Sequence, residues 1–138
     1  MIVYLDASVV LRVLLRDGPA LSVWGQWQAA YTSELLGVEA RRTIDRLRLT
    51  AALDDAAVVA AVASLASVER GIQHISVSRP VLRRAAMPMG TVVKTLDAIH
   101  LASALLLRER QGIELTFATH DHQQATAAQA LGFECIGV

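Results

Sequence analysis

The sequence contains a single cysteine, Cys135, so no disulfide bond can form within the chain. Structural disulfides belong to oxidising compartments, and their absence favours a cytoplasmic location. The neighbours of this cysteine, Phe133, Ile136 and Val138, predict a buried thiol that behaves as a small hydrophobic side chain. We therefore expect a fold that is held together by its core rather than by covalent links.

A net charge is absent as well. The thirteen basic residues, twelve arginines and one lysine, are balanced by thirteen acidic residues. No overall field then attracts the chain to nucleic acid or to an anionic membrane, and any phosphate binding must be local. No run of about 18 apolar residues could cross a bilayer. Asp6 interrupts the first apolar run, and no secretory cleavage pattern follows it.

The chain also lacks linkers, low-complexity tracts and internal repeats. Its 138 residues predict one domain, spanning 1–138, which buries roughly two-thirds of the surface of the unfolded chain. Hydrophobic residues make up 54% of the sequence, somewhat above the usual ~45–50%. A fully packed sheet explains this excess, and a subunit or partner interface would add to it.

Short β-type runs alternate with longer helical patterns, the order typical of parallel βαβ units. Strands are expected at residues 2–6, 31–32, 74–77, 114–119 and 134–136. Helices are expected at about 7–14, 20–28, 33–47, 54–69, from about 80, 95–111 and 122–131. The sequence thus predicts a three-layer α/β/α sandwich with a mostly parallel sheet of four to five strands.

Four acidic residues stand where this apolar pattern breaks. Asp6 closes the first strand, Glu39 lies in a helix, Asp97 opens another helix, and Asp121 follows the strand at 114–119. Side chains just past the carboxyl ends of parallel strands share one crevice, even when they are far apart in sequence. Carboxylates gathered there repel one another unless cations neutralise them. The pattern therefore predicts a divalent metal site.

Three of the four acids also have an ordinary structural explanation. Asp6 and Asp121 could serve only as helix N-caps. Asp97 would stabilise the first turn of a helix whatever its function. Glu39 lies on or next to an apolar face, where a carboxylate is costly unless it is paired or bound to metal. Their shared placement, rather than any one of them, favours a functional site.

Other polar residues accompany the four acids. The Ser8 hydroxyl could hold the Asp6 carboxylate or a metal-bound water, and Thr119 crowds the same crevice. His100, three residues after Asp97, could suggest a transition-metal pair, but a buried histidine bonded to backbone is the simpler expectation.

Three charged residues lie in helices that begin at the crevice. Arg12 and Arg42 fall one or two turns along their helices. Either guanidinium could clamp phosphate, although a solvated face accounts for each singly. Glu34 lies in a first helical turn, where an acid stabilises the helix without any catalytic duty.

Four sequence blocks resemble the signature blocks of PIN-domain proteins, most closely the VapC-type toxins of bacterial toxin–antitoxin pairs. The blocks keep the order of that family and span nearly the whole chain. They are Leu5-Asp6-Ala7-Ser8-Val9-Val10, Thr32-Ser33-Glu34-Leu35 followed by Glu39, Leu96-Asp97-Ala98-Ile99-His100-Leu101-Ala102-Ser103-Ala104, and Thr119-His120-Asp121 followed by Ala130-Leu131-Gly132-Phe133.

The resemblance implies an endoribonuclease that depends on Mg²⁺ or Mn²⁺, is held inactive by a cognate antitoxin and is usually a homodimer. It assigns metal binding and catalysis to the same four acids, and it matches Ser8 and Thr119 to supporting polar positions. The implied reaction is hydrolysis of RNA by metal-activated water. The chain departs from the family in one respect, because it lacks the basic surplus that many such nucleases show.

Two alternatives stay open on the sequence. An aspartyl-phosphate phosphatase usually needs a second acid two residues after the first, where this chain has Ser8, and a lysine near the crevice, for which only Lys94 is available. A non-catalytic PIN-like module that binds RNA or protein is supported by the neutral net charge. For such a module the Ala- and Val-rich helix expected at 55–68 offers a partner surface, although core packing also explains its composition.

Overall fold

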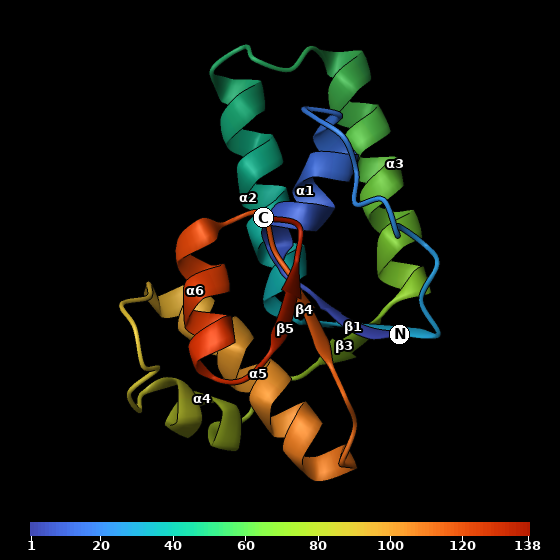
Figure 1. The fold of residues 1–138 in the computed structure, drawn as a ribbon. Coiled ribbons are helices and arrows are strands. Elements are labelled where there is room, and N and C mark those ends of the chain that lie inside the picture. Colours follow the sequence, from blue (N-terminus) through green and yellow to red (C-terminus); the bar gives the residue numbers. More distant parts are fainter.

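The computed structural model describes all residues from Met1 to Val138, and strands alternate with helices along the chain (Figure 1). The elements are β1 (Ile2–Leu5), α1 (Ala7–Leu15), β2 (Ala29–Ser33), α2 (Leu35–Leu49), α3 (Asp55–Gly71), β3 (Gln73–Ile75), α4 (Arg79–Ala85), α5 (Thr95–Gln111), β4 (Thr116–Ala118), α6 (His122–Ala130) and β5 (Glu134–Ile136). This alternation confirms the α/β class.

The sheet has five parallel strands in the order β3-β2-β1-β4-β5. On the central strand, Val3 pairs with Ala30 of β2 on one side and with Thr116 of β4 on the other. The chain moves outward from β1 to β3 and then returns to β4 across β1, so the strand order reverses between β1 and β4. Open parallel sheets bind ligands at such a reversal, outside the carboxyl ends of the strands.

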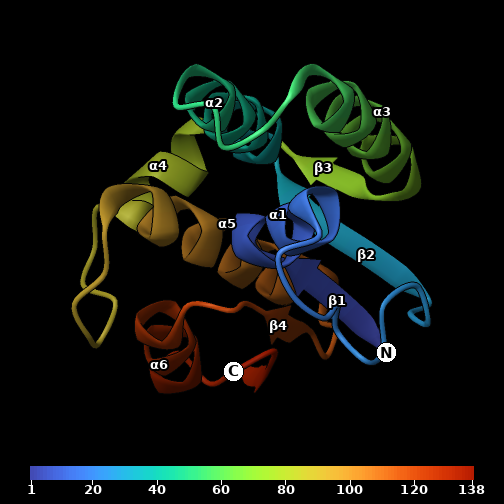
Figure 2. The same cartoon turned by 90° about the horizontal axis from the view of Figure 1, so that it is seen from above.

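Helices cover both faces of the sheet, which confirms the three-layer sandwich. Alternate residues of a strand point to opposite faces. Val3 and Leu5 therefore pack with α1, α2 and α3, whereas Tyr4 packs with α4, α5 and α6. Tyr4 stacks on Phe117 of β4 with 5.2 Å between ring centroids. The helices α2 and α3 lie side by side and extend beyond the sheet (Figures 1 and 2).

The helix expected at 20–28 is wrong, because this segment forms turns. Trp24 N donates to Leu21 O at 2.9 Å. Gly25 has φ +77°, in the left-handed region through which a right-handed helix cannot continue. Trp24 and Trp27 nevertheless face the core and pack edge to face at 5.2 Å. The apolar spacing that suggests a helix thus comes from two tryptophans anchoring a turn.

The strand β2 is longer than expected, since it covers Ala29–Ser33 rather than 31–32 alone. Alanine has a low intrinsic preference for strands. Ala29 and Ala30 are nevertheless paired with Ile2 and Val3 of the central strand. Pairing with a buried neighbour has therefore overridden the local preference.

The Ala- and Val-rich helix expected at 55–68 is α3, capped by the Asp54 side chain, which accepts a hydrogen bond from Ala57 N. Its buried residues are Ala61 and Leu65, while Val59 is 69% exposed. Core packing therefore explains only part of its composition. No helix in the protein is both long and apolar enough to span a membrane.

Candidate active site

Asp6 lies at the carboxyl end of β1 and is the N-cap of α1. Its side chain is almost fully buried, and one oxygen, Oδ2, accepts all of its strong hydrogen bonds. The donors are Ser8 N at 3.1 Å, Ser8 Oγ at 2.6 Å and Thr119 Oγ1 at 3.1 Å. The other oxygen, Oδ1, lies 3.9 Å from His100 Nε2. The cap therefore fixes the carboxylate and leaves one oxygen directed toward the interior of the crevice.

Asp121 follows β4 and caps α6, as its cap interpretation predicts. Its Oδ1 accepts from Gln123 N at 2.8 Å and from Gln124 N at 3.1 Å. Asp121 N donates to Thr119 Oγ1 at 3.0 Å, which ties the cap to the hydroxyl that also holds Asp6. The second carboxylate oxygen of Asp121 has no protein donor. Capping thus uses only half of this carboxylate.

Gln124 is a buried member of the site that the sequence did not single out. Its side chain is fully buried, with Oε1 2.9 Å from Thr119 Oγ1 and Nε2 without a partner. The Thr119 hydroxyl has one proton, and the Asp6 carboxylate can only accept it. If the Gln124 amide turns its nitrogen toward Thr119, Nε2 donates to the Thr119 oxygen, and the Thr119 proton stays free for the Asp6 carboxylate. A polar residue on the buried face of α6, three residues after Asp121, is the signal that could have identified it.

The edge strand β5 supports Thr119 from behind. Thr119 N donates to Ile136 O at 3.1 Å, and His120 Nδ1 lies 2.6 Å from Gly137 O. Gly137 has φ +101°, and a Cβ placed there would lie 2.5 Å from Thr119 O. Only glycine fits at this position without moving the backbone that carries the Thr119 hydroxyl.

Asp97 lies in the first turn of α5 and is half-buried. Burial, followed by the negative charges of Asp6 and Asp121, raises the pKa of its carboxyl from 3.8 to about 6. The charges of His100 and Lys94 oppose them. Carboxylates far apart in the sequence therefore share one electrostatic environment.

Glu39 reaches the same environment through a buried histidine. His100 is fully buried on α5, and its Nε2 lies 2.6 Å from Glu39 Oε1 while its Nδ1 lies 2.8 Å from the Tyr4 hydroxyl. The expected backbone partner for His100 is thus wrong. The carbonyls of α5 are already used within the helix, and the ring instead bridges β1 and α2. With both nitrogens engaged, His100 does not form a metal pair with Asp97.

The pKa of His100 reflects these neighbours. Burial lowers it, but the hydrogen bond to Glu39 and the charges of Asp6, Glu39 and Asp97 outweigh burial, so the pKa is raised above its ordinary value. Glu39, whose side chain is 18% exposed, has in His100 the partner that its placement near an apolar face requires.

Tyr4→Phe isolates this hydrogen-bonded bridge. The substitution keeps the ring stacked on Phe117 but leaves His100 Nδ1 buried without a partner, so we expect a loss of about 1–3 kcal/mol in the free energy of unfolding. Tyr31→Phe is the matched control, because the hydroxyl of the half-buried Tyr31 has no hydrogen bond. Urea denaturation of both variants measures the difference, and equal stabilities would contradict the bridge.

The remaining expected residues lie outside this group. Arg42 is 70% exposed and pairs with Asp45 at 3.2 Å. The Arg12 side chain packs near Gly18. Neither contacts the four acids, and their phosphate-binding role stays a prediction. Glu34 is the N-cap residue of α2, which begins at Leu35 rather than at the expected residue 33.

The Glu34 carboxylate accepts from Val77 N at 3.0 Å and from Ser76 Oγ at 3.3 Å. It therefore fixes the segment between β3 and α4, which is a structural role. The hydroxyl of the preceding residue, Ser33, accepts a hydrogen bond from Leu35 N at 3.2 Å.

The donor chemistry of the site suits a hard divalent cation. No lysine or arginine forms an ion pair with any of the four acids. The available groups are carboxylate and hydroxyl oxygens, which Mg²⁺ prefers. No three His, Cys, Asp or Glu side chains form a ready-made metal cage. Mg²⁺ does not need one, since it usually keeps several waters and binds through one or two carboxylates.

Comparison with known proteins adds independent observations. A sequence model of the PIN domain matches residues 3–129. The chain is 27% identical over 139 residues to Ribonuclease VapC47 of Mycobacterium tuberculosis (strain CDC 1551 / Oshkosh), and the match covers 95% of this chain and 93% of that protein.

Solved structures share the fold. VapBC2 from Rickettsia felis, in a structure bound to a DNA fragment from its own promoter, matches with a TM-score of 0.66 and 11% identity. The match covers 99% of this chain and 98% of that chain. FitAcB from Neisseria gonorrhoeae matches with a TM-score of 0.66 and 19% identity over 97% and 96%. VapC20 from Mycobacterium tuberculosis, a sarcin-ricin loop cleaving toxin, matches with a TM-score of 0.62 and 17% identity over 99% and 98%.

Proposed function

The chain belongs to the PIN-domain family, and on this premise we propose that it is a metal-dependent endoribonuclease that acts as the toxin of a toxin–antitoxin pair. One observation supports the proposal above the others. The pKa of Asp97 is raised to about 6 by burial and by the charges of Asp6 and Asp121. Asp6, Asp97 and Asp121, none of which pairs with a lysine or arginine, would therefore share a cation at the carboxyl ends of β1 and β4, where a parallel sheet binds its ligand.

Asp6, Asp97 and Asp121 would hold the metal, and Mg²⁺ suits their oxygen donors better than a softer ion. When bound, the metal lowers the pKa of a coordinated water and neutralises charge on the phosphate. Ser8 and Thr119 keep Asp6 in place through hydrogen bonds to Oδ2. Mn²⁺ is the second choice of ion, because it accepts the same oxygen ligands.

Glu39 has a distinct role in this proposal. His100 holds its Oε1 at 2.6 Å, while its Oε2 has no protein donor and is available to accept a proton from the attacking water. A positioned carboxylate of this kind acts as a general base. No nucleophilic side chain is then needed, since water attacks phosphorus directly.

The structure offers less support for an aspartyl-phosphate phosphatase. Such chemistry needs a second acid near Asp6, but the residue at that spacing, Ser8, donates to Asp6 Oδ2 at 2.6 Å. Incubation with a phosphoryl donor followed by mass spectrometry would detect a covalent phosphate on Asp6 if this alternative held.

The proposed partners are an RNA substrate, a cognate antitoxin and a second copy of the chain. The similar structures include VapBC2 and FitAcB, and the similar curated protein is named a ribonuclease. The single cysteine supports a reducing, cytoplasmic location.

Expression of the chain alone in a bacterial host is expected to arrest growth, and co-expression with the protein encoded beside its gene is expected to restore it. Purified protein should cleave members of a panel of structured RNAs when Mg²⁺ is present. Absence of cleavage across the panel, with either Mg²⁺ or Mn²⁺, would contradict the enzymatic proposal.

A further inference from the structure

The neutral net charge conceals a locally basic stretch. Between Glu69 and Asp97 the sequence contains five basic residues and no acidic one. The basic residues are Arg70, Arg79, Arg83, Arg84 and Lys94. Three of them belong to α4, and Lys94 is the residue that precedes α5. Asp97 lies in the first turn of that helix, so the positive charge of Lys94 lies next to the acidic crevice.

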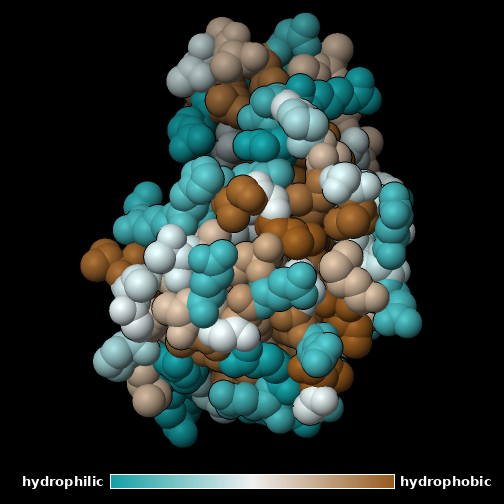
Figure 3. Space-filling view, viewed as in Figure 1, coloured by the Kyte–Doolittle hydropathy of each residue, from teal (hydrophilic) through white to brown (hydrophobic).

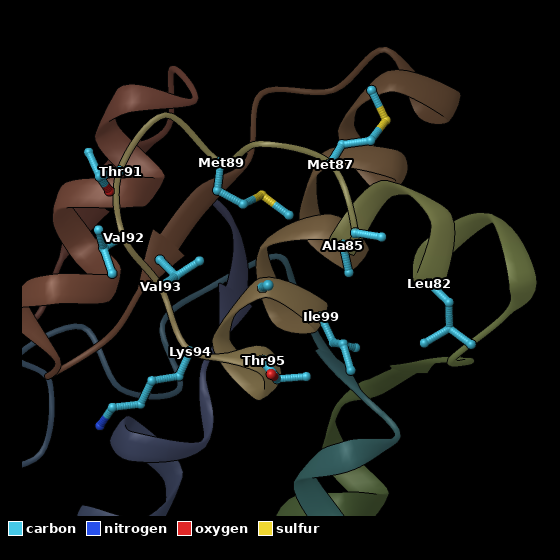
Figure 4. Close-up of a pocket in the computed structure, with 12 residues that line it drawn as sticks. Leu82, Ala85, Met87, Met89, Thr91, Val92, Val93, Lys94, Thr95 and Ile99 are labelled. Carbon is cyan, nitrogen blue, oxygen red and sulfur yellow. The ribbon is translucent and has the colours of Figure 1, made fainter.

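A pocket of about 520 Å³ lies between α4, the following loop and the start of α5 (Figure 4). Most of its lining is apolar, and the residues that matter here are Leu82, Met87, Met89, Val92 and Ile99. Met87 is 57% exposed and Val92 is 79% exposed. Figure 3 shows apolar side chains projecting at the edge of the molecule where Figure 1 draws this loop. The pocket therefore opens to solvent with flexible apolar walls, which fit flat ligands of varied shape.

The cations stand beside this pocket and are unpaired. Arg79 and Arg83 are one turn apart on α4, on the strip that also carries the wall residue Leu82. Neither forms an ion pair or a side-chain hydrogen bond, and neither does Lys94. Arg84 differs, because it donates to Pro88 O at 3.4 Å and lies 3.8 Å from Met89 Sδ, which holds the loop.

Lys94 connects the pocket to the acidic crevice. Its residue lines the pocket, while its side chain extends away from the two methionines (Figure 4). Its positive charge acts on Asp97, whose pKa it lowers. A polyanion that reaches Asp97 therefore also meets the positive charge of Lys94.

We propose that the RNA strand on one side of the cleaved bond runs along Lys94, Arg83 and Arg79, here called the α4 basic strip, and places one unstacked nucleobase in the adjoining pocket. The inference rests on the proposed function. It adds the path that the RNA takes across the surface and the expectation that the RNA is single-stranded there. Unpaired cations complement phosphates, and apolar side chains can sandwich an extruded base. The strip adjoins the carboxylates that act on a phosphodiester, which favours RNA over an acidic protein segment as its occupant.

Binding is tested in the Asp97→Asn background, so that the RNA stays intact, with a single-stranded RNA oligonucleotide of random sequence. Combined substitution of the α4 basic strip by glutamine is expected to weaken affinity at least ~10-fold at low salt. It should also reduce the slope of log affinity against log salt by about 2, since each phosphate contact with a single strand contributes about 0.7.

The matched control carries the same loss of charge on α2. Arg41 and Arg48 pair with Glu69 and Asp45, and Arg46 is an exposed residue of the same helix. Substitution of these three by glutamine should leave the salt slope unchanged. An equal loss in the control would show that only overall charge matters and would overturn the proposal. So would an unchanged slope in the strip variant.

The pocket is tested separately. Met87→Ser with Val92→Ser should lower affinity for the oligonucleotide about fivefold or more without changing the salt slope, because base stacking does not depend on salt as phosphate contacts do. Val59→Ser on α3, at a residue that is 69% exposed, is the control and should have no effect. Affinity equal to that of the parent protein in the double variant would overturn the base-binding part.

Two further outcomes separate the proposals. If strip variants bind RNA normally but lose affinity for the protein encoded beside the gene, the strip belongs to a protein partner and the inference is wrong. If the unsubstituted protein cleaves RNA while strip variants bind it normally, only the inference fails. A protein that never cleaves RNA contradicts the proposed function instead.

Discussion

Asp97→Asn protein is expected to fold normally and to lose RNA cleavage by more than the ~10–100-fold that is typical of residues which merely orient a metal ligand. Asparagine keeps the shape of the side chain but removes the charge that a divalent ion needs. Because Asp97 shares its electrostatic environment with Asp6 and Asp121, the loss should affect the whole site. Cleavage at the parental rate would show that this carboxylate takes no part in the chemistry.

The same variant should be more stable than the parent without metal. The folded-state pKa of Asp97 is raised from 3.8 to about 6, so its contribution to stability is fully present below pH ~4 and is lost as pH rises through ~6. At pH 7 the parent carries a half-buried negative charge near Asp6 and Asp121, and the Asn variant does not. The Tm of the variant in EDTA should therefore exceed the parental value by about 3–5 °C. At pH 4 the two Tm values should converge.

Glu109→Gln is the control for both measurements. Glu109 lies near the other end of the same helix, is exposed and forms no ion pair. Its substitution should change neither cleavage nor the difference in Tm between pH 4 and pH 7. A gain in Tm together with a loss of activity is the combination expected of a functional carboxylate, since a merely structural acid would lose stability when substituted.

Removal of divalent metal is expected to abolish cleavage, and addition of Mg²⁺ to restore it. No lysine or arginine pairs with the four acids, and His100 is close only to Glu39 and Asp6, so without metal the crevice repels the phosphate it must bind. Mn²⁺ should substitute for Mg²⁺, because both ions accept oxygen ligands. Full activity in excess EDTA would rule out the metal-dependent mechanism.

Metal binding also has a readout that does not depend on turnover. A ligand that binds only the folded state stabilises it by about 2.7 kcal/mol at 100 times its Kd. Mg²⁺ should therefore raise the Tm of the parent and of Glu109→Gln, and should raise that of Asp97→Asn much less. Equal stabilisation of Asp97→Asn and the parent would place the metal elsewhere.

Much of the fold follows from periodic patterns in the sequence. The alternation of apolar runs with helical stripes predicts the parallel sheet, and Gly112, with φ +60°, ends α5 where its position suggests. The terminal strand at Glu134–Ile136 is also as predicted. These features depend on local spacing, which is present in any single sequence.

The wrong predictions, a helix at 20–28 and a strand limited to 31–32, have a different origin, because tertiary contacts override local preference there. The spacing of Trp24 and Trp27 resembles a helix, but Gly25 turns the chain and both rings pack on the core. Ala29 becomes a strand residue because Ile2 lies opposite it. The core residues around the two tryptophans and Ile2 opposite Ala29 are distant in sequence, so a local pattern does not reveal them.

Some features of the candidate site can likewise be predicted from the sequence, and others cannot. The positions of Asp6 and Asp121 can be predicted, because each follows an apolar strand and precedes a helix. The partner of His100 cannot, since Tyr4 and Glu39 come from elements 96 and 61 residues away. The metal-binding roles of the four acids stay predictions until the experiments above are done.

The packing of Gly137 against Thr119 has an evolutionary consequence. An added methyl group at 137 would displace the Thr119 carbonyl, and the displacement would reach Asp6 through the Thr119 hydroxyl. In a saturation library selected for toxicity, position 137 should therefore tolerate almost no replacement, although its residue has no functional group of its own. Selection against substitutions at Gly137 would then show how small a shift of the edge strand is enough to impair the nuclease.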